Sequence, residues 1–206
     1  MRAALLEKNQ QPLSLVDDVD IADPGPGEVL VKVTHCGICH SDLTVVDMPG
    51  GGQLPCVLGH EAAGIVEEVG SAVTRLAKGD RVMLTPLPTC GACYYCSRNQ
   101  PSLCVEGQTF MTGTRADGTS PLSRGGEMVY QGFGLGGWGE YATVTERRAV
   151  KIDDDTPLEI ACVIGCAIQT GVGAVLNTAK VEEGATVLVT GLGGIGVSIV
   201  QGARLA

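Results

Sequence analysis

The stretch TCGACYYCSRNQPSLC, residues 89–104, places four cysteines close together with the spacing C-x2-C-x2-C-x7-C. Such thiols can form disulfides, a redox pair, an iron–sulfur cluster or a zinc site. Iron–sulfur runs of this type close after a gap of about three residues and a proline follows. This one closes after seven residues and is followed by valine. The spacing therefore predicts a structural zinc site whose four ligands are Cys90, Cys93, Cys96 and Cys104.

Composition argues against disulfides and against several classes of partner. The cysteine count is nine, an odd number, so a complete set of disulfides is impossible. The first residues lack the apolar core of a signal peptide, and we therefore expect a cytoplasmic protein whose thiols stay reduced. The net charge of −9 without a basic cluster argues against nucleic acid and membrane partners. We also expect no membrane span, because no stretch approaches about 18 apolar residues.

The nearby segment HCGICHSDL, residues 35–43, raises a different possibility. Its first cysteine opens C-x-x-C-H, the signature by which haem is attached covalently to a protein. Haem attachment of this kind belongs to exported proteins, and the sequence shows no export signal. We therefore interpret the segment as a source of metal ligands.

An open zinc site would use the second cysteine of that segment, Cys39, together with His60 and one distant thiol. Such a Cys2His site leaves a fourth position for water or substrate. Spacing does not choose the third ligand among Cys56, Cys162 and Cys166. Cysteine is also common as a small buried apolar residue, which is the role that we expect of Cys36, Cys56 and Cys162.

The first 85 residues are expected to be rich in strands, and strand character returns after residue 139. Apolar residues alternate or form short runs between turn signals in five segments, which are 28–34, 62–70, 80–85, 140–145 and 149–152. The stretch 105–139, rich in Gly, Ser and Thr, is expected to be a long irregular excursion.

A helical pattern begins at Thr156. This residue is the expected N-cap, Pro157 the first helical position and Glu159 the partner in a capping box. Further along the chain, the apolar segment TVLVT predicts a strand over residues 186–190. A glycine turn and another helix are expected to follow it as far as Ala206.

That glycine turn has the pattern G-x-G-x-x-G at Gly191, Gly193 and Gly196. It follows an apolar strand and precedes an apolar helix, the context in which such glycines let the backbone approach a pyrophosphate. The same pattern occurs twice in GFGLGGWG, residues 132–139, where neither match follows a strand or opens a helix. We expect residues 132–139 to be a flexible loop.

Six motifs together resemble the zinc-containing medium-chain alcohol dehydrogenases of the long-loop type with a structural zinc, over essentially the whole chain. In the family's order they are CGICHSDL, GHEAAGIVEEVG, GDRV, the four-cysteine loop, IGCAIQTGVGAV and GLGGIG. The resemblance implies an α/β protein with an N-terminal GroES-like β-barrel catalytic domain. That domain would span residues 1–168 and carry the zinc loop 90–104. The first βα unit of a truncated Rossmann domain would occupy residues 169–206.

The resemblance also implies a role for each residue of the metal site. A catalytic zinc would be held by Cys39, His60 and Cys166. A nearby carboxylate would come from Glu61, and Asp42 would orient His60.

Proton transfer is implied as well. Ser41 would pass the proton of the alcohol onward, but the histidine that many members carry three residues later is replaced by Thr44. The proton could leave through Thr44, His40, a ribose or water, and the sequence does not choose among these. Contacts to the nicotinamide cofactor are implied for His40 at the pyrophosphate, for Thr170, and for the glycine turn of Gly191, Leu192, Gly193, Gly194, Ile195 and Gly196.

The implied activity is hydride transfer between a primary or aromatic alcohol, or its aldehyde, and a nicotinamide cofactor. We expect two zinc ions per chain and NAD as the cofactor. NADP is not excluded, because the residue that selects between NAD and NADP is expected about 20 residues past the glycine turn, which is beyond Ala206. A homodimer or homotetramer is expected of the full-length protein, whereas the 206 residues alone are expected to bind zinc but not NADH.

Two alternatives remain open. The first is a thiol-dependent formaldehyde dehydrogenase of the glutathione or mycothiol type, which needs basic residues to receive an anionic thiol. Arg115 and Arg124 are the only basic residues of the excursion, so simple alcohols are favoured. The second is a catalytically inactive zinc-binding fragment.

Overall fold

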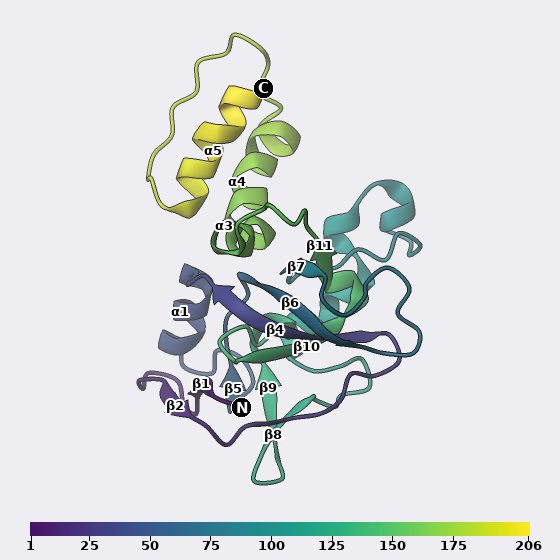
Figure 1. The fold of residues 1–206 in the computed structure, drawn as a ribbon. Coiled ribbons are helices and arrows are strands. Elements are labelled where there is room, and N and C mark those ends of the chain that lie inside the picture. Colours follow the sequence, from purple (N-terminus) through teal and green to yellow (C-terminus); the bar gives the residue numbers. More distant parts are fainter.

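The computed structural model describes residues 1–206 apart from the side chain of residue 108. Two curled sheets form the body of the molecule, and a helical unit, which comprises residues 158–206, stands above them (Figure 1). The larger sheet has the order β2-β1-β5-β9-β8-β3, in which β5 and β9 pair in parallel and the other neighbours pair antiparallel. Its strands are β1 Ala3–Leu6, β2 Ser14–Val16, β3 Asp20–Ile21, β5 Cys56–Val57, β8 Leu122–Arg124 and β9 Glu127–Gln131.

The second sheet has five antiparallel strands in the order β10-β4-β6-β7-β11, and it confirms the five strands expected from the sequence. Alternate residues of its longest strand, Val29 and Val31, are fully buried and pack in one core with Val66 and Val144. This is the alternation expected of a strand with one face on the core. The strands are β4 Glu28–Cys36, β6 Ala62–Val69, β7 Arg81–Leu84, β10 Tyr141–Thr145 and β11 Ala149–Lys151.

A short helix that the sequence analysis missed follows β4. It is α1 (His40–Asp47), and its N-cap is Cys39. The carboxylate of Asp42, at the third helical position, accepts a hydrogen bond of 3.2 Å from the backbone N–H of Cys39. An acidic residue at this position is one half of a capping box and could have signalled the helix.

The excursion over residues 105–139 is not irregular throughout, and that expectation is wrong for its second half. Strands β8 and β9 form a hairpin there. The connecting residues Gly125 and Gly126 have φ values of 58° and 86°, which suit a two-residue hairpin turn. The remaining short helical turns of this region and its neighbours are η1 Cys96–Arg98, η2 Pro101–Leu103, η3 Val105–Gln108, α2 Thr109–Thr112, η4 Gly132–Gly134 and η5 Glu146–Arg148.

The segment 132–139 is a packed turn rather than a flexible loop. Four consecutive residues from Gly134 to Gly137 are buried. Backbone hydrogen bonds join Gly137 to Gly59 at 2.8 Å and Trp138 to Leu58 at 2.9 Å. The segment is therefore fixed against the chain that leads into β6.

One continuous helix spans residues Leu158–Ala179. It begins one position later than expected: the N-cap is Pro157, whose carbonyl accepts hydrogen bonds from Ile160 and Ala161, and no side chain caps the helix. The predicted capping box of Thr156 and Glu159 is therefore wrong. Its successive parts are α3 Leu158–Val163, the π-helical η6 Ile164–Ile168, α4 Gln169–Gly173 and the π-helical η7 Ala174–Ala179.

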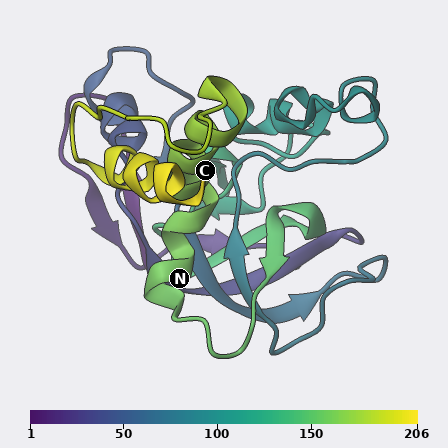
Figure 2. The ribbon, with the colours of Figure 1, turned by 90° about the horizontal axis from the view of Figure 1, so that it is seen from above.

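By length and composition this helix could cross a membrane, contrary to the sequence-based expectation that no stretch would. A single helix of this kind is weak evidence, because a core helix of a soluble protein passes the same test. Its first half packs against β4, β6 and β7, and its second half packs against α5 (Gly194–Leu205), which lies alongside it (Figure 2). The predicted domain boundary after residue 168 falls inside this helix and remains a prediction.

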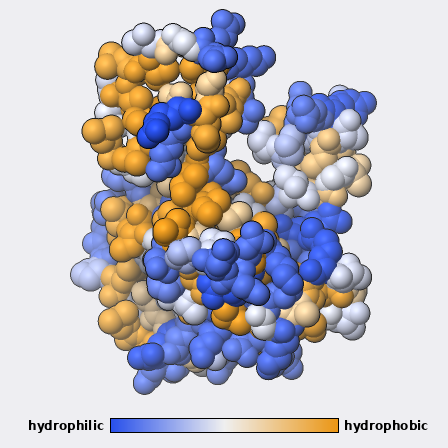
Figure 3. All heavy atoms as spheres, turned by 45° about the horizontal axis from the view of Figure 1, so that its top comes forward, coloured by the Kyte–Doolittle hydropathy of each residue, from blue (hydrophilic) through white to orange (hydrophobic). Residues whose placement is uncertain are grey.

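Residues 186–190 do not form the predicted strand, and residues 181–193 contain no strand in the structure. A parallel strand is stabilised by backbone hydrogen bonds to neighbouring strands. The described part of the chain places no strand beside residues 186–190. Leu188 is accordingly 88% exposed. Apolar side chains gather on the surface of the helical unit (Figure 3), including Leu176, Leu188, Leu192, Ile195, Val197, Val200 and Leu205.

Candidate metal centres

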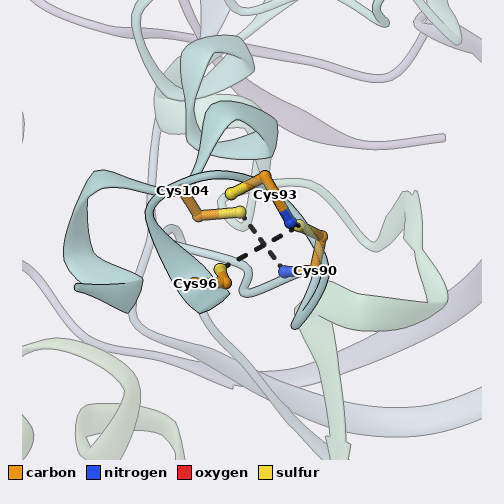
Figure 4. A group of neighbouring side chains, drawn as sticks. All are labelled: Cys90, Cys93, Cys96 and Cys104. Carbon is orange, nitrogen blue, oxygen red and sulfur yellow. Dashed lines mark hydrogen bonds between the residues drawn. The ribbon is translucent and has the colours of Figure 1, made fainter. Parts of the chain in front are cut away.

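The four cysteines of the zinc loop point toward one another (Figure 4). Their sulfur atoms all lie within 4.8 Å of each other, and the Sγ atoms of Cys90 and Cys96 are 3.9 Å apart. A tetrahedral zinc with bonds of about 2.3 Å to sulfur requires sulfur–sulfur distances of about 3.8 Å. The donor set and its dimensions therefore fit a closed, structural zinc site.

Backbone N–H groups of the loop point at these sulfur atoms. Cys93 donates from its backbone to the Sγ of Cys90 at 3.2 Å, and Cys90 donates to the Sγ of Cys104 at 3.2 Å. Backbone N–H groups of Cys96 and Val105 lower the pKa of Cys93 to about 6. The loop thus favours the thiolate form of Cys93, which is the form that binds a metal, whereas burial raises the pKa of Cys96 to about 11.

A second cluster joins three distant parts of the chain. The ligand atoms of Cys39, His60 and Cys166 lie within 4.8 Å of one another. The Sγ atoms of Cys39 and Cys166 are 3.9 Å apart, and the Sγ of Cys166 is 3.4 Å from Nε2 of His60. Of the three cysteines that spacing left open, the structure brings Cys166 to this cluster. Three ligands of this type fit an open zinc site with a free fourth position.

Helix geometry explains how Cys166 reaches the cluster. The residue lies in the π-helical turn η6, and such turns are frequent at functional sites. The preceding residue, Gly165, is buried against the end of β7, where a Cβ atom would stand 2.2 Å from the carbonyl oxygen of Leu84. Glycine is therefore required for the helix to approach the sheet closely enough to place Cys166 near Cys39.

His60 is oriented by a buried carboxylate. Its Nδ1 lies 3.1 Å from Oδ1 of Asp42, and both side chains are almost completely buried. Nε2 is thereby left to face the two sulfur atoms. Burial alone would lower the pKa of His60, but hydrogen bonds to Asp42 and Cys166 outweigh it and raise the pKa to about 10. The surroundings of the imidazole thus stabilise positive charge, and a metal ion at Nε2 would take the place of the proton.

We expect Asp42→Asn to lower the zinc affinity of this cluster by about 10- to 100-fold, the usual effect of losing a carboxylate behind a histidine ligand. Asp42 also accepts hydrogen bonds from the backbone of Gly59 and Cys39, at 3.0 and 3.2 Å. An amide NH2 at this position would face one of these donors. Zinc content after dialysis against graded chelator concentrations measures the change, and an unaltered affinity would contradict it.

The remaining residues expected in the catalytic site differ in how far the geometry supports them. Ser41 Oγ lies 3.6 Å from Cys39 Sγ, at the surface. Glu61 is buried and lies against Gly37, where a Cβ atom would be 2.3 Å from its Oε2. Thr44 donates its hydroxyl to the carbonyl of His40 at 3.0 Å. The catalytic roles of Ser41, Glu61 and His40 remain predictions.

The glycine turn has the form of a phosphate cradle. Gly191 has φ of +86°, which favours glycine, and a Cβ at Gly196 would stand 1.9 Å from the carbonyl oxygen of Gly191. A Cβ at Gly193 would meet nothing within 4 Å, so space is open in front of the turn. This arrangement at the N-terminus of α5 fits a dinucleotide pyrophosphate. Contacts of the cofactor with His40, Thr170, Leu192, Gly194 and Ile195 remain predictions.

The other three cysteines lie outside both clusters. Burial raises the pKa of Cys36 and of Cys56 to about 12, and it also raises the pKa of Cys162. These thiols are therefore protonated at neutral pH. Cys56 and Cys162 are buried and Cys36 packs against the core, which agrees with the small apolar role expected of them.

Sequence reasoning missed an aromatic neighbour of the second cluster. The ring centroid of Phe133 lies 4.4 Å from that of His60. The ring centroid of Phe110 lies 5.0 Å from that of Phe133. Phe133 belongs to the glycine-rich turn that was expected to be flexible. No spacing rule would have pointed to it, because its position depends on the fold.

Comparison with known proteins agrees with this architecture. A family model described as an alcohol dehydrogenase GroES-like domain matches residues 25–154. The chain belongs to the zinc-containing medium-chain alcohol dehydrogenase family. The resemblance inferred from the six motifs is thereby confirmed, as is the GroES-like character of its N-terminal fold.

Relatives of this chain carry a more specific name. An S-(hydroxymethyl)glutathione dehydrogenase from Synechocystis sp. is 45% identical over 207 residues, covering 100% of this chain and 56% of the relative. A protein of the same name from Escherichia coli is 44% identical with the same coverage. The chain therefore spans about half the length of the curated relatives it matches.

Two solved structures share the fold. An alcohol dehydrogenase zinc-binding domain protein from Burkholderia ambifaria is 38% identical with a TM-score of 0.92, covering 100% of this chain and 56% of that one. Benzyl alcohol dehydrogenase from Acinetobacter calcoaceticus is 35% identical with a TM-score of 0.89, covering 99% and 55%.

Proposed function

We propose that the protein containing this chain is a zinc-dependent dehydrogenase that oxidises a hydroxyl group by hydride transfer to NAD(P). The observation that carries the proposal is the open cluster of Cys39, His60 and Cys166. Zinc would supply a Lewis acid that lowers the pKa of a hydroxyl, and the nicotinamide would supply the hydride acceptor.

The chain's own residues would hold and orient these groups. Cys39, His60 and Cys166 would bind the catalytic zinc, while Asp42 fixes the imidazole so that Nε2 faces the ion. Ser41, beside Cys39 and open to solvent, would accept the proton of the substrate hydroxyl and pass it outward.

Replacing Ser41 with alanine should therefore lower turnover by about 10²-fold, the usual contribution of a general acid or base. Zinc content should not change, since Ser41 is no ligand. Steady-state kinetics and elemental analysis of the full-length variant test both statements. Normal turnover would place the proton pathway elsewhere.

The first substrate candidate is an S-hydroxymethyl thiol adduct of formaldehyde. It differs from the simple alcohols that the sequence analysis favoured, and the names of the 44–45% identical relatives support it. The hydroxymethyl carbon would lose a hydride to NAD⁺ and its hydroxyl would lose a proton to solvent. The product would be a formyl thioester.

The second candidate is a primary or aromatic alcohol, for which the geometry offers two observations. The ring of Phe133 lies beside His60, the ring of Phe110 packs against Phe133, and this aromatic pair would suit an apolar substrate. Arg115 is bound by Glu28 at 2.7 and 2.8 Å, and Arg124 is bound by Asp18 and Glu7 at 2.8 and 3.0 Å. Neither arginine is therefore free to receive an anionic thiol.

A direct comparison of substrates tests the proposal. The full-length protein would be assayed for NADH formation with formaldehyde plus glutathione, with formaldehyde alone and with benzyl alcohol. Turnover that requires glutathione supports the first candidate, and turnover of benzyl alcohol alone supports the second. No turnover by protein that holds zinc in both centres would favour the inactive zinc-binding alternative.

Other features of the whole protein remain predictions. These are two zinc ions per chain, NAD rather than NADP, a homodimer or homotetramer, and a cytoplasmic location. Both zinc sites have suitable ligands within the described residues.

A further inference from the structure

Arg148 has an unusual environment for an arginine. It ends η5, and only 3% of its surface is exposed. Its Nη1 donates hydrogen bonds to the carbonyl oxygens of Pro86, at 2.5 Å, and Phe133, at 3.5 Å. Its Nη2 lies 2.5 Å from the hydroxyl oxygen of Thr109. One guanidinium group thus joins three segments: the chain before the zinc loop, the chain after it, and the turn beside His60.

This cation has no carboxylate partner among the described residues. Burial lowers the pKa of Arg148 to about 10, and the more distant Glu106 only partly offsets this effect. A buried charge is costly unless its surroundings compensate it. The three neutral acceptors provide that compensation here: the contacts to Pro86 and Thr109 are short and charge-assisted, and the contact to the carbonyl of Phe133, at 3.5 Å, is the longest of the three.

Phe133, one of the three acceptors, has a strained backbone. Its φ is 54° and its ψ is 21°, in the left-handed region that non-glycine residues rarely adopt. Such conformations persist when the surroundings fix them, and they cluster at functional sites. The ring of the same residue lies 4.4 Å from that of His60.

We propose that Arg148 is a positioning residue, which binds the carbonyl of Phe133 and thereby holds its ring against His60. The direction of the imidazole is then set from two sides. Asp42 fixes Nδ1 by a hydrogen bond, and Phe133 restricts the rotation of the ring. The catalytic part of this inference rests on the proposed function, while its metal-binding part does not.

The neighbouring Arg147 provides a matched control. Its Nη1 donates to the carbonyl of Cys90, and its Nε lies 3.6 Å from Glu106. It therefore contacts the zinc loop itself, whereas Arg148 contacts the chain on either side of that loop, and no contact joins Arg147 to Phe133 in the described structure. Arg147→Met should leave the His60 centre unchanged.

The test uses the full-length protein with Arg148→Met, Arg148→Lys and Arg147→Met. Lysine keeps the charge but lacks the planar fork that binds several acceptors at once. We expect both changes at Arg148 to weaken zinc binding at the Cys39–His60–Cys166 cluster and to shift the cobalt absorption bands of that centre. Turnover should fall by about 10-fold or more with little change in KM, because small misplacements near the reacting atoms are costly.

Each outcome decides the inference. A lower melting temperature of Arg148→Met with unchanged zinc affinity, cobalt spectrum and turnover would make Arg148 merely structural and overturn the proposal. If Arg148→Met does not fold, Arg148→Lys and Thr109→Val decide by the same measurements. If the wild-type protein turns over no alcohol, the proposed function fails, and zinc affinity together with the cobalt spectrum still decides the role of Arg148.

Discussion

Replacing Cys39 with serine should remove one of the two proposed zinc ions and lower turnover by at least about 10³-fold. A metal ion contributes several kcal/mol of transition-state stabilisation, and each 1.36 kcal/mol corresponds to a factor of ten. The serine hydroxyl is a poor zinc ligand, and Cys39 supplies one of only two sulfur atoms in its cluster. Elemental analysis and steady-state kinetics of the full-length variant measure the two effects.

Cys162→Ser is the matched control for this experiment. Cys162 lies on the same helix as Cys166, one turn earlier, and its Sγ lies 3.3 Å from the carbonyl oxygen of Glu159. Since it is no member of the cluster, its replacement should leave both zinc ions and most of the turnover. Loss of a zinc ion in Cys162→Ser but not in Cys39→Ser would contradict the ligand assignment.

Local sequence patterns correctly predicted the elements that bury one apolar face within the described part of the chain. Alternation in EVLVKVT predicted β4, because Val29 and Val31 face the core. The strand at residues 186–190 was predicted from the same kind of pattern and did not form, since its hydrogen bonds depend on neighbouring strands. The hairpin of β8 and β9 was missed although its Gly-Gly turn is a recognised signal.

The two metal centres differ in how much the sequence could reveal. The zinc loop is compact, so spacing alone predicted all four of its ligands. The second cluster joins residues 127 positions apart, Cys39 and Cys166, and spacing could not distinguish Cys166 from Cys56 or Cys162. The family resemblance supplied that choice, and the helix packing at Gly165 explains it physically. The role inferred for Arg148 depends on a backbone conformation that no sequence pattern encodes.

Replacing Cys93 with serine should remove the other zinc ion and lower the melting temperature by at least about 10 °C. Structural zinc contributes directly to folding, with apparent binding free energies of about 10–16 kcal/mol in small zinc domains. Even a few kcal/mol of this loss would suffice, because each kcal/mol shifts the melting temperature by about 2–4 °C in a domain of this size. Calorimetry and elemental analysis of the full-length variant measure the two effects.

The reason for so large an effect is the poor packing of the loop without its metal. Its three-residue turns η1 and η2 contain no buried residue, and Tyr94 and Leu103 are 62% and 56% exposed. Few apolar contacts therefore remain to order the segment once a sulfur ligand is lost. Ser97→Ala, within the same loop but outside the cluster, should keep both zinc ions and nearly the wild-type melting temperature. An equally large loss of stability in Ser97→Ala, or an unchanged melting temperature in Cys93→Ser, would show that zinc does not hold this loop together.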